Sequence, residues 1–191
     1  MATPFYKIGL GLVILLALAG CQKDPPYMNE PIPFINYEGY QQRTLTDDFG
    51  NRYDSLTISI GYQDGDGDLG LSSATGHPDM GPPYQFLNPN GTRNPNYYNF
   101  IIDTFLKRNG VYEPFPFPTP GFTYSGRFMR LSQDDRVEPL EGTLRYSLPP
   151  WYQSTISRPG TVVKFRIYIK DRALNNSNVV ETDDIVLFTG Q

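Results

Sequence analysis

The chain of 191 residues has little of the chemistry that common enzyme classes require, since it contains one cysteine and one histidine. A single cysteine cannot form a disulfide within the chain. One histidine argues against a multi-histidine zinc site and a serine–histidine–aspartate triad. The net charge is −4 and the sequence shows no basic patch, which argues against a nucleic-acid partner. The glycines at 65, 67 and 70 are separated by aspartates that would repel phosphate, so we expect no nucleotide either.

No apolar segment is long enough to span a membrane. The longest, at residues 8–19, holds about a dozen residues, whereas a spanning helix needs about 20. It follows Lys7 and ends in Leu18-Ala19-Gly20-Cys21. Charge, length and small residues are typical of a secretory signal peptide, and the final four residues resemble the lipobox of bacterial lipoproteins. The resemblance implies that residues 1–20 are removed and that Cys21 carries a diacylglycerol and an N-acyl chain.

The residues after Cys21 indicate a destination for the lipidated chain. Gln22, where an aspartate would favour inner-membrane retention, points to the outer membrane, and Gln22-Lys23-Asp24 resembles the surface-export signal of Bacteroidetes lipoproteins. We therefore expect a lipid anchor in the outer membrane, with the cell surface favoured over the periplasmic face. Residues 21–30 are polar and contain Pro25-Pro26, which is typical of a tether.

Residues 31–191 are expected to form a single all-β domain. The 14 tyrosines, 12 phenylalanines, 18 prolines and 18 glycines favour strands and turns over helices. Apolar residues alternate with polar ones at 56–62 and 161–170, the pattern of half-buried strands. Asn109-Gly110 predicts a tight hairpin turn, and 77–96 reads as a long irregular connection. Further strands are predicted at 32–37, 97–107, 111–113, 124–131, 142–148 and 179–188, which together predict an immunoglobulin-like antiparallel β-sandwich of about seven to nine strands with long loops.

A turn near the C-terminus adds a resemblance to this fold class. Residues 171–178, Asp-Arg-Ala-Leu-Asn-Asn-Ser-Asn, resemble the final hairpin of bacterial immunoglobulin-like and fibronectin-III-like domains, although Leu174 stands where glycine is common. With the lipobox and the acidic loop described next, the chain resembles outer-membrane lipoproteins of Bacteroidetes. The resemblance implies a fold and a location, but no particular activity.

Residues 64–70, Asp-Gly-Asp-Gly-Asp-Leu-Gly, form an acidic loop after a predicted strand. Asp64, Asp66 and Asp68 can converge on one hard cation, because the glycines let the backbone curl. The loop is not an EF-hand, since Leu69 replaces the required glycine and Thr75 replaces the bidentate glutamate.

A second loop could complete this cation site. If the strands at 56–62 and 161–170 run in the same direction, the loops that follow them emerge at one end of the sandwich. Asp171 and Asn175 could then add oxygens, which leads to the hypothesis of a Ca²⁺ site joining the two loops. The alternative is a solvated acidic turn whose glycines serve only the backbone.

Aromatic residues suggest a binding surface. Tyr112, Phe115 and Phe117 alternate with prolines, and Trp151-Tyr152 follows another proline pair. These rings could contact a sugar or a protein, but we favour the interpretation that they pack onto the sandwich.

The leading functional hypothesis is a non-catalytic envelope protein that binds another envelope protein or a glycan, or that has a structural role. The alternative is an accessory or catalytic component of surface polysaccharide utilisation, which binds or hydrolyses glycan. A pair of carboxylates about 5–10 Å apart in a cleft would favour hydrolysis, and an aromatic surface without such a pair would favour binding.

Overall fold

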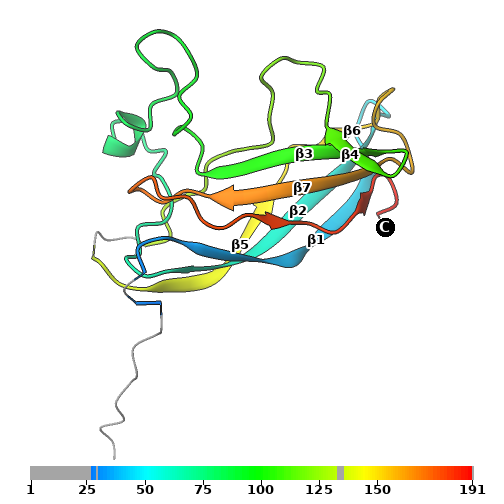
Figure 1. The fold of residues 1–191 in the computed structure, drawn as a ribbon. Coiled ribbons are helices and arrows are strands. Elements are labelled where there is room, and N and C mark those ends of the chain that lie inside the picture. The colour runs from blue at the N-terminus through cyan, green and yellow to red at the C-terminus, as the bar shows by residue number, and fades with distance from the viewer. Residues whose placement is uncertain (1–26, 29, 133–135, 191) are drawn as a thin grey trace, which may run out of the picture.

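The structure, a computed structural model, describes residues 27–28, 30–132 and 136–190. The predicted signal peptide, Cys21 and residues 22–26 of the predicted tether lie outside these ranges. The described residues form nine strands and one short 3₁₀ helix, η1 (Pro78–Met80) (Figure 1). One sheet holds β1 (Phe34–Thr46), β2 (Arg52–Asp64), β5 (Leu140–Ser147) and β6 (Trp151–Tyr152). The other holds β3 (Phe100–Arg108), β4 (Val111–Pro114), β7 (Val162–Ile169), β8 (Val180–Glu181) and β9 (Ile185–Val186).

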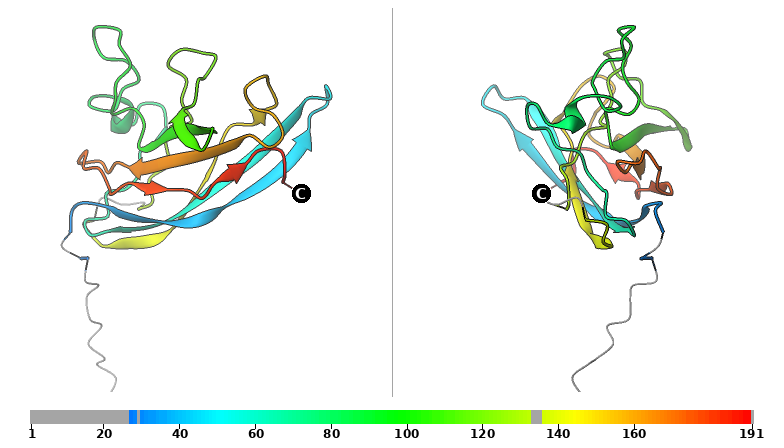
Figure 2. Two further views of the ribbon diagram at one scale, coloured as in Figure 1. Left: turned by 45° about the vertical axis from the view of Figure 1, so that its right-hand side comes forward. Right: turned by 90° about the vertical axis from the view of Figure 1, so that its left-hand side faces the viewer.

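The two sheets are antiparallel and lie as two layers, as Figure 2 shows. The first has the order β1-β2-β5, with β6 paired to the beginning of β2. The second has the order β4-β3-β7-β8, with β9 also paired to β7. The chain passes from one sheet to the other after β2, after β4 and after β6. The two antiparallel sheets confirm the predicted all-β sandwich.

The core forms where the inward faces of β2 and β7 meet. Alternate residues of β2 are buried, as are alternate residues of β7, which confirms the period-two prediction for both strands. The fully buried side chains include Leu56, Ile58 and Ile60 from one sheet and Phe165 and Ile167 from the other.

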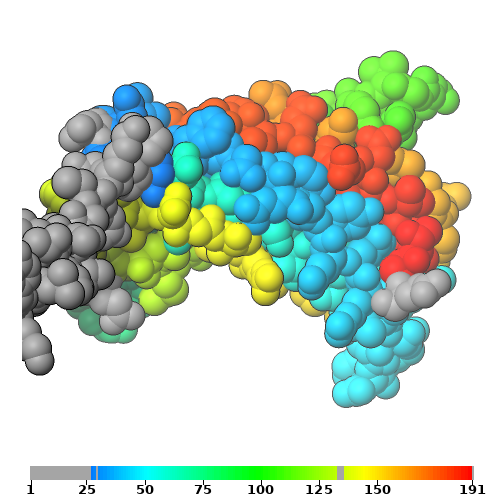
Figure 3. All heavy atoms as spheres, turned by 90° about the horizontal axis from the view of Figure 1, so that it is seen from below, coloured from blue at the N-terminus to red at the C-terminus, as the bar shows by residue number. Residues whose placement is uncertain are grey.

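Side chains join the edge of β1 to the C-terminal segment. Asn178 accepts a hydrogen bond from the Ile35 amide and donates one to the Ile35 carbonyl, each at 2.8 Å. Buried Asp54 accepts hydrogen bonds from Gln42, Thr44 and the Phe188 amide. Figure 3 shows the outer face of the first sheet, with the C-terminal residues (red) along the β1 edge (blue).

Three predicted elements differ from the structure. The segment at 124–131 is not a strand: it has one β-bridge, from Gly126 to Phe100, and scattered backbone hydrogen bonds to Leu69 and Leu71, while the Asn99 side chain bonds both the amide and the carbonyl of Phe128. The first strand extends well beyond 32–37 and pairs along β2 through a bulge at Gly39. The segment at 179–188 forms two short strands, because the Thr182 hydroxyl accepts the Phe165 amide hydrogen bond between them. The Asn109-Gly110 hairpin turn is confirmed, with φ angles of 51° and 81°.

Two arginines organise the long connection that includes η1. The guanidinium of Arg127 donates hydrogen bonds to four backbone carbonyls, those of Ser72, Asp79, Tyr84 and Tyr97, at 3.1–3.2 Å. Arg130 donates from Nε and Nη2 to the two carboxylate oxygens of buried Asp79, at 2.8 and 2.9 Å. A segment without regular secondary structure therefore has fixed partners for its backbone groups.

The Asp79–Arg130 pair predicts a loss of stability in acid. Hydrogen bonds from Arg130, the largest cause, lower the pKa of Asp79 from 3.8 to about 2. Because the folded pKa is the lower one, the stabilisation is present above about pH 4 and is lost as the pH falls through about 2; the difference corresponds to about 2 kcal/mol. Urea unfolding at pH 6 and pH 2 should show the advantage of the natural protein over Asp79→Asn shrinking by that amount. An advantage independent of pH would contradict this prediction.

Candidate functional site

The structure places the acidic loop beside the loop that follows β7. β2 leads into Asp64 and β7 leads into Asp171, and both strands end at the same end of the sandwich (Figure 1). Leu69 forms a β-bridge with Asp171, and the Ala173 amide donates to Oδ2 of Asp68 at 2.9 Å. The adjacency expected from strand direction is therefore present.

Three carboxylates converge within the acidic loop. Asp64, Asp66 and Asp68 each contribute one carboxylate oxygen, and these oxygens lie within 4.8 Å of one another. Asp64 is 1% exposed, because segments distant in the sequence cover the loop. A Cβ atom at Gly67, whose φ is 71°, would collide with the Glu138 carbonyl, so the covering backbone requires glycine there.

Burial dominates the electrostatics of this cluster. It is the largest cause that raises the pKa of Asp64 to about 7, followed by the charges of Asp66, Asp68 and Asp171. Burial likewise raises the pKa of Asp171 to about 6, against the opposing effect of its hydrogen bond from Asn175. The pKa of Asp68 is raised by burial and by Asp66, while Arg172 lowers it. Removing water from several like charges makes the ionised cluster unfavourable unless a cation joins it.

Asp171 lies close enough to the three converging aspartates for its charge to raise the pKa of Asp64, but its carboxylate is not part of the converging group, and Asn175 bonds it. The backbone amide of Asn175 donates to Oδ1 of Asp171 at 2.7 Å, and its side-chain nitrogen donates to Oδ2 at 2.8 Å. The same nitrogen donates to the Pro31 carbonyl at 3.2 Å. Asn175 therefore positions Asp171 and also contacts the chain just before β1.

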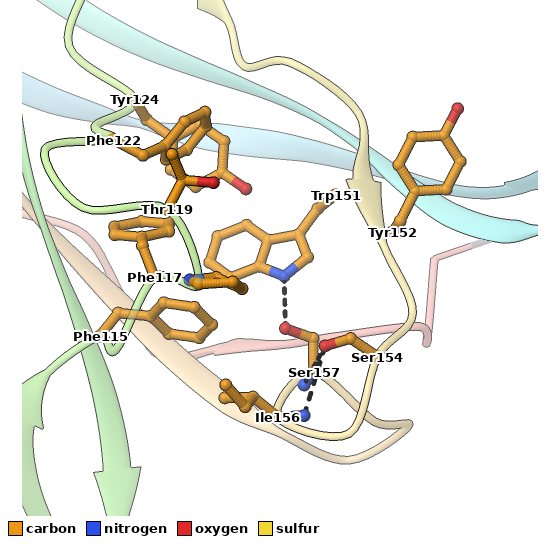
Figure 4. A pocket seen from close by; sticks show the side chains of 11 residues that line it. Phe115, Phe117, Thr119, Phe122, Tyr124, Trp151, Tyr152, Ser154, Ile156 and Ser157 are labelled. Carbon is orange, nitrogen blue, oxygen red and sulfur yellow. Dashed lines mark hydrogen bonds between the residues drawn. The ribbon is translucent and has the colours of Figure 1, made fainter.

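Four of the five aromatic residues singled out in the sequence lie at a pocket near the opposite end of β2. Figure 4 shows this pocket, which has a volume of about 260 Å³. Phe115, Phe117, Trp151 and Tyr152 line it, as do residues that sequence reasoning missed, namely Pro118, Thr119, Phe122, Tyr124, Ser154, Ile156 and Ser157.

Trp151 forms the floor of this aromatic pocket. It is 3% exposed, its indole Nε1 donates to Oγ of Ser157 at 2.7 Å, and its ring packs against those of Phe115 and Tyr124 at centroid distances of 5.1 and 4.9 Å. Tyr152 points away from this floor (Figure 4) and is 46% exposed. The rings of Phe115 and Trp151 therefore pack onto the sandwich, as we favoured from the sequence, whereas the ring of Tyr152 stays accessible to solvent.

Tyr112 lies outside the pocket, on β4. Its hydroxyl donates to Asp184, and the ammonium groups of Lys107 and Lys164 lie 5.3 and 4.7 Å from its ring centroid. These contacts join β4 to the segment between β8 and β9. Tyr112 therefore packs in a different place from Phe115 and Phe117, which line the pocket.

No family model, no curated protein and no solved structure matches the chain. Within the described ranges, no helix has the length and apolar character needed to cross a membrane. The acidic loop and the aromatic pocket are therefore the features of the chain that bear on its function.

Proposed function

We propose that this chain is a lipid-anchored, non-catalytic binding protein of the bacterial outer membrane, and that the aromatic pocket is its binding site. The lipidation of Cys21 and the location rest on the sequence signals described above. The observation that carries the binding role is a pocket lined by five aromatic side chains, Phe115, Phe117, Phe122, Tyr124 and Trp151.

The exposed rim of the pocket supports a partner. Phe122 is 43% exposed beside a floor that is already well packed, whereas the exposed ring of Tyr152 packs against Tyr53 outside the pocket. Large aromatic side chains are typical anchors of interfaces, because they bury much apolar area while losing few rotatable bonds. An apolar ring, such as a proline or aromatic side chain of an envelope protein, would cover them and fit the apolar lining.

The composition of the lining favours binding over hydrolysis. The residues that line the pocket, all within the described part of the chain, include neither aspartate nor glutamate. Glycoside hydrolysis requires a pair of carboxyl groups beside the scissile bond, so this pocket does not supply the catalytic pair. The hydroxyl groups of Thr119 and Ser154 beside exposed rings do suit a sugar, so glycan binding is the second candidate.

The position of the pocket also supports this function. β6, which supplies Trp151 and Tyr152, pairs with Tyr53 and Asp54 near the beginning of β2, whereas the chain enters the domain beside the end of β2. The ten residues from Asp54 to Asp64 span about 30 Å as a strand. The pocket would therefore face away from the tether and the membrane.

Crosslinking on intact cells tests the proposal. We expect purification of the full lipoprotein to recover a partner protein, and Phe122→Ala to reduce that recovery about tenfold or more, because truncating an interface anchor costs upward of 1–2 kcal/mol. Phe34→Ala is the matched control, since Phe34 is 52% exposed at the beginning of β1, where it pairs with Gln63 at the end of β2 opposite the pocket. Equal recovery with all three proteins would contradict the proposed site. A saturable change in Trp151 fluorescence on adding oligosaccharides, without any crosslinked protein, would favour the glycan candidate.

A further inference from the structure

The acidic loop meets the geometric requirement for one bound cation. Ca²⁺ takes oxygen ligands at 2.3–2.6 Å, so two ligands of the same ion lie at most about 5 Å apart. The converging oxygens of Asp64, Asp66 and Asp68, within 4.8 Å of one another, satisfy that limit. All three are carboxylate oxygens, the donors that hard cations prefer over nitrogen or sulfur.

The loop also contains buried oxygens without partners. The Oδ1 atoms of Asp64, Asp66 and Asp68 are shielded from solvent and have no hydrogen-bond partner among the described residues. The Oδ2 atoms of Asp64 and Asp68 are engaged, since they accept hydrogen bonds from the amides of Asp68 and Ala173, each at 2.9 Å. The hydrogen bonds of the loop thus use one set of oxygens and leave the other set unsatisfied. Leaving such oxygens buried is costly, and a cation would satisfy them.

The surrounding charges leave this cluster strongly negative. Asp171 adds a fourth carboxyl group beside the three aspartates, while Arg172 brings one positive charge near Asp68. A divalent cation would offset most of the remaining repulsion, which a solvated surface turn would not experience because water would screen it.

Three residues shortly before β1 lie against the two loops, Tyr27 and Glu30 against Gly65 and Pro31 against Asn175, and we call them the tether root. The Gly65 amide donates to the Glu30 carbonyl at 3.1 Å, and Asn175 reaches the Pro31 carbonyl. A Cβ atom at Gly65 would lie 2.6 Å from the Glu30 carbonyl oxygen, so the backbone of the tether root lies directly on this glycine.

We infer that Asp64, Asp66 and Asp68 bind one Ca²⁺ ion, and that this ion fixes the acidic loop against the loop after β7 and against the tether root. Asp171, held by Asn175, adds negative charge beside the site, and water completes the six to eight oxygens that Ca²⁺ takes. The site lies at the opposite end of β2 from the aromatic pocket, so it is independent of the proposed partner binding.

Calorimetric titration of the full lipoprotein in detergent, stripped of metal by a chelator, tests the site. We expect one Ca²⁺ to bind per chain and Mg²⁺ to bind at least tenfold more weakly. At about 100 times the dissociation constant, Ca²⁺ should raise the thermal midpoint by about 5–10 °C, given the usual dependence of the midpoint on stability for a chain of this size.

Asp66→Asn should change the melting temperature in opposite directions with and without Ca²⁺. Oδ1 of Asp66 has no hydrogen-bond partner, so the substitution removes a charge without breaking the hydrogen bonds of Asp64 and Asp68. Without metal, the variant should melt at the same temperature as the natural protein or higher, because repulsion is relieved. With saturating Ca²⁺ it should melt lower, and its Ca²⁺ affinity should fall at least tenfold. Asp48→Asn, the same charge change in the exposed β1–β2 turn, should leave the affinity unchanged.

Several results would overturn the inference. Absence of binding heat and of any midpoint shift at 5 mM Ca²⁺, a concentration on the order of the weakest extracellular calcium sites, would remove the site. Equal affinity for Ca²⁺ and Mg²⁺, or unchanged Ca²⁺ binding by Asp66→Asn, would remove the assignment. Hydrogen exchange tests the connection to the tether root: Ca²⁺ should protect the amides of Glu30 and Gly65 but not that of Gly110 in the distant hairpin. If Ca²⁺ binds without protecting them, the tether root is not fixed by the ion.

Discussion

Replacing Cys21 with serine should release the protein from the membrane fraction completely. The proposed diacylglycerol and N-acyl chain would place several acyl chains in the bilayer, and each buried methylene group contributes about 0.8 kcal/mol. A single acyl chain gives only reversible binding, whereas several together anchor the protein stably. The described residues supply no spanning helix that could take over this role. Fractionation of cells and mass spectrometry of the mature N-terminus would measure the effect.

The control for this experiment keeps the cysteine and changes its neighbour. Gln22→Asp should leave lipidation intact while favouring inner-membrane retention, if the enterobacterial sorting rule applies. The protein would then stay in the total membrane fraction but change its density in a sucrose gradient. Membrane association of Cys21→Ser equal to that of the natural protein would contradict lipid anchoring.

Arg127→Met should destabilise the domain by about 3 kcal/mol. The substitution keeps much of the side-chain volume but leaves four backbone carbonyls without their donor, and hydrogen bonds from a charged group contribute about 1.5–3 kcal/mol each before water replaces some of them. It also removes the guanidinium that lies 5.0 Å from the ring centroid of Tyr97. Urea unfolding would measure the loss, and hydrogen exchange should show the greatest loss of protection between residues 72 and 97.

Arg145→Met provides the matched comparison, since Arg145 is exposed on β5. An exposed arginine of this kind should change the free energy of unfolding by less than about 0.5 kcal/mol. If the two variants lose equal stability, or if exchange increases uniformly over the sandwich in Arg127→Met, the guanidinium does not organise the connection.

The strands were predictable from sequence where burial on one face imposes period-two alternation, as in β2 and β7. The segment at 124–131 misled the prediction because apolar residues such as Tyr124 and Phe128 are buried there without a ladder, their backbone being bonded to side chains and to single backbone groups of a loop. The Arg127 contacts were equally hidden, since an arginine in sequence does not reveal which carbonyls it will meet.

The two candidate sites differ in how far the sequence predicts them. The acidic loop was recognisable because Asp64, Asp66 and Asp68 are close in the chain and because strand direction brings Asp171 beside them. The pocket was recognisable only in part, since it combines residues 115–124 with residues 151–157, and no local pattern indicates that these segments meet. Proline-interrupted aromatics in both segments were the one available signal.

The long pairing of β1 with β2 has a mechanical consequence for an anchored protein. The chain enters at Phe34 beside the end of β2, while the pocket is attached near the beginning of β2, so tension between membrane and partner would run along these strands. The turn after Thr46 joins β1 to the beginning of β2, so this tension would pass along a covalent backbone that is already extended and has little slack. The sandwich is thus oriented to resist pulling between the proposed anchor and the proposed partner.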